Sequence, residues 1–75
     1  MNTDDYQREF GARLKLIRKR QALTQEQFAE KIGYSQPTIT RIESGKRMAD
    51  AYLVKRVAEE FRCDVAWLLT GKGDP

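Results

Sequence analysis

The residues best suited to chemistry lie in a short polar stretch, QPTITRIES, at positions 36–44. If this stretch is a helix, successive side chains are separated by about 100° around its axis. One side of such a helix then carries amide, hydroxyl and guanidinium groups and no acid: Gln36, Pro37, Thr40, Arg41 and Ser44. Such groups can hydrogen-bond base edges or phosphates without repelling the phosphate charge. A merely solvated helix surface can have the same composition, so this face alone leaves both interpretations open.

The helix before this face is delimited by capping residues. Thr24 is a favourable N-cap, and Gln27 stands three residues later, as in a capping box. Gly33 can end the helix in the left-handed conformation that other residues adopt only at a cost. The sequence therefore predicts a helix over 25–32.

Ser35 is the N-cap that predicts a second helix, over 36–44. Pro37 is compatible with its first turn, where backbone N–H groups have no partner within the helix. A residue before proline avoids helical angles, so the start is uncertain by one position. Two short helices joined at Gly33 are thus expected to present the polar face.

Apolar periodicity predicts three further helices, over about 5–21, 50–62 and 65–69, followed by a tail at 71–75. The fold class expected is all-α. Gly11 interrupts the first helix at a cost of about 1 kcal/mol relative to alanine, which indicates either close approach of a neighbouring element or simple tolerance.

Length and composition limit the chemistry that is available. Seventy-five residues suit a single domain over 1–75. The chain has no histidine, and its one cysteine, Cys63, cannot form an internal disulfide. We therefore expect no catalytic residue, no metal, no cofactor and no enzymatic activity. Because no run of about 18 apolar residues and no leader peptide is evident, we also expect a cytoplasmic protein without a membrane segment.

Charge is unevenly distributed along the chain. Residues 11–48 carry nine Lys or Arg and three Glu, a net charge of +6, whereas the remaining residues sum to −3. A phosphate-facing surface on one side of a domain would produce this pattern, and so would a solvated run of charges. The outer face of the 36–44 helix has no aromatic residue, which argues against binding single strands by base stacking.

Three segments, LTQEQFAEKIG, SQPTITRIESGK and DVAWLLTGKG, together cause the chain to resemble the helix-turn-helix family of lambdoid phage repressors and Cro proteins. The resemblance covers nearly the whole chain. It implies a compact five-helix bundle whose second and third helices form the helix-turn-helix, with the third in the DNA major groove. Ala29 would be small because the two helices touch there, and Gly33 would supply the turn.

The resemblance also implies roles for individual residues. The expected base-contacting residues are Gln36, Pro37, Thr40 and Arg41. Glutamine can bond bidentately to adenine, and arginine to guanine. The expected DNA-backbone contacts are Gln25, Ser35, Ser44, Lys46 and Arg47.

Glu43 lies at the edge of the apolar face of the 36–44 helix, where an unpaired carboxylate would be costly to bury. In the family an arginine of the first helix pairs with this glutamate, and the matching residue here is Arg18. The chain departs from the family pattern at Arg62, where glycine is frequent, and at Met48-Ala49, where proline is frequent. These departures concern loops and leave the recognition helix unchanged.

The function implied is a sequence-specific double-stranded DNA-binding transcriptional regulator, a repressor more often than an activator. It would act as a homodimer on a near-palindromic operator. Val65, Trp67 and Leu68 are candidate dimer contacts, with Trp67 better suited to the core. An antitoxin or adaptor with a protein partner is the alternative, whereas an enzyme is disfavoured because no nucleophile and base are paired.

Overall fold

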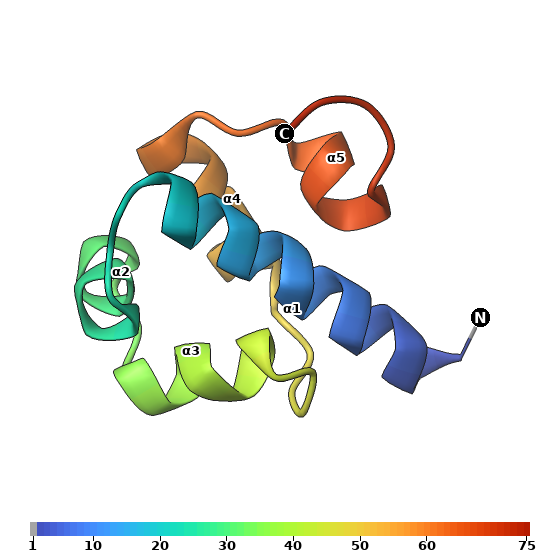
Figure 1. Ribbon diagram of the computed structural model, residues 1–75, viewed down its shortest axis with the longest axis horizontal. Coiled ribbons are helices and arrows are strands. Elements are labelled where there is room, and N and C mark those ends of the chain that lie inside the picture. The colour runs from blue at the N-terminus through green and yellow to red at the C-terminus, as the bar shows by residue number, and fades with distance from the viewer. Residues whose placement is uncertain (1) are drawn as a thin grey trace.

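The computed structural model describes residues 2–75, which form five helices and no strand (Figure 1). The helices are α1 (Thr3–Arg20), α2 (Gln25–Ile32), α3 (Gln36–Glu43), α4 (Ala51–Phe61) and α5 (Val65–Thr70). The long α1 crosses the middle of the molecule, with α2 and α3 on one side and α5 on the other. The predicted all-α fold of five helices is confirmed.

Several helix boundaries differ from the predicted ones by one or two residues, and α1 ends at Arg20 instead of residue 21. α1 begins at Thr3 instead of residue 5, because the side chain of Asn2 accepts the N–H of Asp5 at 2.8 Å. The bounds predicted for α2 are confirmed. α3 ends at Glu43, α4 is one residue shorter at each end than 50–62, and α5 is one residue longer than 65–69.

The caps around the helix-turn-helix are those expected from the sequence. Thr24 and Gln27 form the complete capping box, and Gly33 ends α2 with a φ of 80°. The hydroxyl of Ser35 accepts the N–H of Thr38 at the start of α3. The orientation of α3 relative to α2 is therefore set by local chemistry.

The core is a continuous set of apolar side chains contributed by all five helices. Its fully buried large members are Leu14, Phe28, Ile32, Ile39, Ile42, Leu53, Val57 and Leu68. Every buried side-chain nitrogen or oxygen in residues 2–75 has a hydrogen-bond partner. No helix within these residues is long and apolar enough to cross a membrane.

Two polar side chains attach α5 to α1. The hydroxyl of Tyr6 donates to the carbonyl of Leu69 at 2.8 Å, and Nε of Arg13 donates to the carbonyl of Leu68 at 2.8 Å. Arg62 ends α4 in the left-handed conformation, with a φ of 54°. Arginine at this position therefore adopts the left-handed conformation that glycine would adopt, at a cost in backbone strain.

Candidate nucleic-acid interface

The inner side of α3 rests directly on the backbone of α1 at Gly11. A Cβ added to this glycine would overlap the carbonyl oxygen of Ile42 and would lie 2.8 Å from that of Glu43. Of the two explanations that the sequence left open, close approach is the one found. Only glycine lets the end of α3 come this near to α1.

The loop after α3 also lies against α1. Gly45 has a φ of 79°, and a Cβ there would lie 2.7 Å from Cγ of Arg8. The side-chain amide of Gln7 donates to the carbonyl of Gly45 at 3.2 Å. These contacts position the loop that carries Lys46 and Arg47, both of which are exposed.

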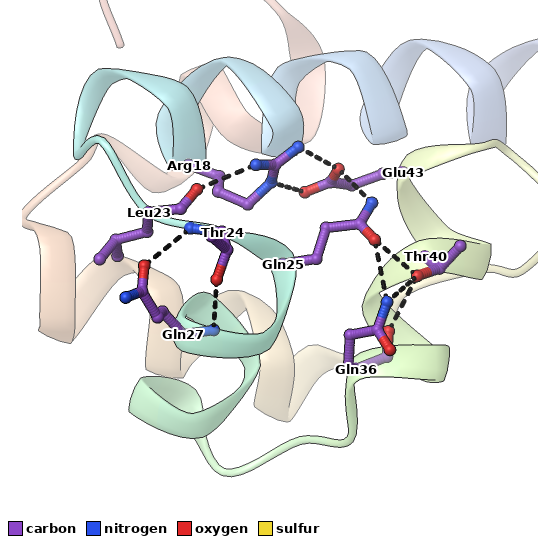
Figure 2. Close-up of polar contacts among 8 residues, drawn as sticks. All are labelled: Arg18, Leu23, Thr24, Gln25, Gln27, Gln36, Thr40 and Glu43. Atoms are coloured by element: carbon purple, nitrogen blue, oxygen red, sulfur yellow. Dashed lines mark hydrogen bonds and ion pairs between the residues drawn. The ribbon is translucent and has the colours of Figure 1, made fainter.

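Arg18 of α1 and Glu43 of α3 form the ion pair expected from the resemblance (Figure 2). Nε and Nη2 of Arg18 donate to the two carboxylate oxygens at 2.7 and 3.0 Å, and Nη1 donates to the carbonyl of Leu23 at 2.9 Å. The Arg18 side chain is 11% exposed and that of Glu43 is 3% exposed. The pair therefore connects α1, α3 and the residues just before α2, and it is largely shielded from water.

Gln25, at the first position of α2, connects this ion pair to the outer face of α3 (Figure 2). Its Nε2 donates to Oε1 of Glu43 at 3.0 Å. Its Oε1 accepts from the hydroxyl of Thr40 at 2.7 Å and from Nε2 of Gln36 at 3.2 Å. Gln25 was expected to contact the DNA backbone. Its bonds to Glu43 on one side and to Thr40 and Gln36 on the other were not predicted from the sequence. A carboxylate can accept about four hydrogen bonds, and a pair with Arg18 does not use all of them. The remaining acceptor positions of Glu43 were the feature of the sequence that could have indicated a further donor.

The four residues expected to contact bases are all exposed on α3, and the first turn of this helix contains no acid. Gln36 and Thr40 are held together, with Nε2 of Gln36 donating to Oγ1 of Thr40 at 3.0 Å. The guanidinium of Arg41 forms no hydrogen bond or ion pair within residues 2–75. Arg41 is therefore free to bind an acceptor from outside, whereas Gln36 already has internal partners.

Two of the expected backbone-contacting hydroxyls already have partners in the protein. Ser35 caps α3 and also bonds to the hydroxyl of Thr38 at 2.9 Å. Ser44, the C-cap of α3, donates to the carbonyl of Arg41 at 3.1 Å. Lys46 and Arg47 therefore offer the more available polar groups next to α3, whereas both ends of the Gln25 amide already have partners.

Tyr34 and Asp50 form a further polar contact that the sequence analysis did not identify. The tyrosine hydroxyl donates to Oδ1 of Asp50 at 2.7 Å, next to the N-terminus of α4. Burial, followed by the bond to Asp50, raises the pKa of Tyr34 to about 12. The bonds from Tyr34 and from the N–H of Leu53 lower the pKa of Asp50. The contact links the turn before α3 to α4.

The side of the molecule formed by α4 and α5 carries an open apolar groove of about 480 Å³. Its lining residues are Ala51, Val54, Lys55, Ala58, Glu59, Val65 and Leu69. Of the three candidate dimer contacts, only Val65 is exposed. Trp67 is in the core, as expected, and the suggestion for Leu68 is wrong because its side chain is fully buried.

Comparison with known proteins identifies similar sequences. A sequence model of the helix-turn-helix family matches residues 14–68. The chain is 38% identical over 64 residues to a propionyl-CoA carboxylase regulator of Cereibacter sphaeroides, covering 85% of this chain and 14% of that protein. It is 39% identical over 66 residues to the HTH-type transcriptional regulator PrtR of Pseudomonas aeruginosa, covering 88% of this chain and 25% of PrtR.

A third relative is an HTH-type transcriptional regulator for the conjugative element R391 of Providencia rettgeri. It is 38% identical over 52 residues, which cover 69% of this chain and 24% of the relative. The chain thus spans a quarter or less of the length of these relatives.

Proposed function

The chain belongs to the helix-turn-helix family of transcription regulators, and on that premise we propose that it binds double-stranded DNA sequence-specifically and represses transcription from a near-palindromic operator. The observation that carries the proposal is the outer face of α3. This face is exposed and free of acids, while its inner side is fixed by Gly11 and by the Arg18–Glu43 pair. A rigid, exposed polar helix suits the major groove.

Within this proposal, residues of α3 read the bases, and residues at its ends and at the start of α2 bind the backbone. The base-contacting set is Gln36, Pro37, Thr40 and Arg41. The phosphate-contacting set is Gln25, Ser35, Ser44, Lys46 and Arg47. Arg41 has the clearest role, because its unpaired guanidinium matches the two acceptors on the major-groove edge of guanine.

We further propose that the protein binds its operator as a homodimer, so that two copies of α3 enter the major groove about 34 Å apart. Val65 and the apolar groove between α4 and α5 are the surface that we assign to the second copy. A regulator of this kind acts where the DNA is, so we expect it in the cytoplasm.

The experiment that tests the function is selection of bound sequences from random duplex DNA. We expect an enriched near-palindrome with half-sites about one helical turn apart. If no sequence is enriched, the apolar groove favours the alternative function, in which an adaptor or antitoxin binds a protein.

Two substitutions then distinguish base reading from backbone binding. Arg41→Ala should cost about 1–3 kcal/mol and relax preference at one base pair. Lys46→Ala should weaken binding to all sequences alike and reduce the salt slope by about one. Equal effects of both substitutions on every sequence would refute these assignments.

A further inference from the structure

We infer that the nearly buried Arg18–Glu43 pair, acting through Gln25, fixes which hydrogen-bonding groups α3 presents, so that Gln36 reads a base through its side-chain oxygen alone. This inference rests on the proposed function and specifies the class of base that Gln36 selects. Gln25 and Glu43 are positioning residues here, because they act through Gln36.

The direction of each bond is set at the buried end of the network. A guanidinium can only donate hydrogen bonds, and an ionised carboxylate can only accept them. Glu43 accepts from Arg18 through both oxygens, so the atom of Gln25 that faces Glu43 must be a donor. The amide nitrogen of Gln25 therefore points inward, and its oxygen points toward α3.

The outward oxygen of Gln25 then determines the bonding of Gln36. A primary amide has two donor protons. Nε2 of Gln36 lies 3.2 Å from Oε1 of Gln25 and 3.0 Å from Oγ1 of Thr40, so each proton has an acceptor. Within residues 2–75 the side-chain oxygen of Gln36 accepts no hydrogen bond. This oxygen is the group that remains for DNA.

Thr40 adds to the same pattern. Its single proton has Oε1 of Gln25 at 2.7 Å as the nearer acceptor and the backbone carbonyl of Gln36 at 3.1 Å as the other. With either acceptor, the outward side of the hydroxyl is a lone pair. The part of α3 around Gln36 and Thr40 thus presents acceptors, while Arg41, on the same face, presents donors.

An acceptor in the major groove pairs with the exocyclic amines of adenine and cytosine and is opposed by the carbonyl oxygens of guanine and thymine. A glutamine with a free amide would instead bond bidentately to adenine, as the sequence analysis expected. The network therefore predicts that Gln36 accepts adenine and cytosine about equally. Specificity at this position is therefore set partly by residues that do not touch the bases.

The test measures affinities for duplexes derived from the selected operator, with each base pair replaced in turn. The pair read by Gln36 is the one whose preference disappears in Gln36→Ala. At that pair, wild type should bind adenine and cytosine within a few-fold of each other and discriminate against guanine and thymine. In Gln25→Ala one amide proton of Gln36 becomes free, and adenine should gain roughly 5- to 150-fold over cytosine.

Gln27→Ala is the matched control, because Gln27 lies on the same helix, is exposed, and its side chain accepts a hydrogen bond only from the backbone N–H of Thr24. It should leave the adenine-to-cytosine ratio unchanged. Any loss of a phosphate contact in Gln25→Ala affects all duplexes equally and cancels in this ratio.

Glu43→Gln provides a second, independent variant. Both oxygens of Glu43 accept from Arg18, so the NH₂ group of a glutamine would face an Arg18 donor in either orientation. The acceptor that fixes the direction of the Gln25 amide is thereby weakened, and discrimination against guanine and thymine should fall. The measurement is made well below the melting temperature of the variant.

Each outcome of the test has a defined meaning. A wild-type preference for adenine over cytosine as large as that predicted for Gln25→Ala would overturn the inference, as would unchanged ratios in both variants. In either case sequence preference at other base pairs would leave the proposed function intact. Equal binding of wild type to every duplex would overturn the proposed function and the inference together.

Discussion

The contact between α1 and α3 differs in kind from the contact between α4 and α5. α3 meets α1 backbone to backbone at Gly11 and is joined to it by a nearly buried ion pair. α4 and α5 meet around an open apolar groove, where Val65 and Leu69 are 42% and 39% exposed. Close packing is thus concentrated behind the helix proposed to read bases, and unfilled apolar surface lies where we place a second copy.

The difference indicates how one small core can support two proposed functions, the reading of bases and the binding of a second copy. A buried ion pair contributes little net stability compared with apolar packing, but it restricts the geometry of the groups that it joins. An exposed apolar groove restricts no geometry and provides area that association can bury. We therefore expect substitutions at the α1–α3 contact to change stability and base reading, and substitutions at the groove to change assembly.

The largest loss of stability is expected from Glu43→Gln. Removing one partner of a buried pair leaves the other charge uncompensated, and we expect a cost of about 3 kcal/mol. Urea denaturation followed by circular dichroism measures this cost. Glu60→Gln is the control, because Glu60 forms an exposed ion pair with Arg56 outside the groove, and its loss should not be measurable. Equal stability of both variants would remove the distinction between the two contacts.

Gly11→Ala should be the next most destabilising change. The added methyl group would collide with the carbonyl of Ile42, and overpacking costs about 1–3 kcal/mol even though alanine favours helix by about 1 kcal/mol. We expect a net loss of up to about 2 kcal/mol in the same denaturation experiment. A more stable variant would mean that α3 can move away from α1, contrary to the tight contact described.

Gly33→Ala tests the same chemical change where space is open. No atom lies within 4 Å of a Cβ at this position, so the cost arises only from the φ of 80° and should be about 1 kcal/mol. Gly33→Asn should recover part of it, because asparagine tolerates the left-handed conformation. Gly11→Asn should recover nothing. Recovery at both positions would show that the α1–α3 contact is not limited by space.

What the sequence predicted well was local. Helix starts and ends at Thr24, Gly33 and Ser35 depend on residues within one turn, so spacing was sufficient to identify them. The Arg18–Glu43 pair is a tertiary contact, which residue spacing alone does not predict. It was predicted from the family resemblance.

What the sequence could not predict depends on how helices cross. The reason for Gly11 required knowing that the end of α3 lies on it, and the role of Gln25 required side-chain positions on two helices. Leu68 was misplaced because α5 has only six residues, too few for periodicity to separate its buried and exposed sides.

Tyr34→Phe should have a smaller, pH-dependent effect, since it removes one hydrogen bond at the surface worth about 0.5 kcal/mol. The bond requires protonated Tyr34, whose pKa is raised from 10.0 to about 12, so its contribution is complete below pH 10 and is lost as the pH rises toward 12. It also requires ionised Asp50, whose lowered pKa means that the contribution is lost as the pH falls below 3.8.

Denaturation of wild type and Tyr34→Phe across this range measures the effect, and the two curves should converge at both extremes of pH. Tyr52→Phe is the control, because Tyr52 is exposed and its hydroxyl forms no hydrogen bond within residues 2–75. A constant difference at all pH values would show that the tyrosine hydroxyl contributes through packing and not through its bond to Asp50.

The groove substitutions should lower monomer stability less than the loss of a fully buried side chain would. Val65 and Leu69 are 42% and 39% exposed, so Val65→Ser and Leu69→Ser remove less buried apolar surface than a core substitution does. If the groove receives a second copy, these variants should weaken self-association in sedimentation equilibrium and reduce cooperative binding to a two-half-site operator, while affinity for a single half-site is retained. Unchanged association would place the dimer contact elsewhere. A loss of half-site affinity would contradict the division between the two contacts, because it would mean that the groove also positions α3.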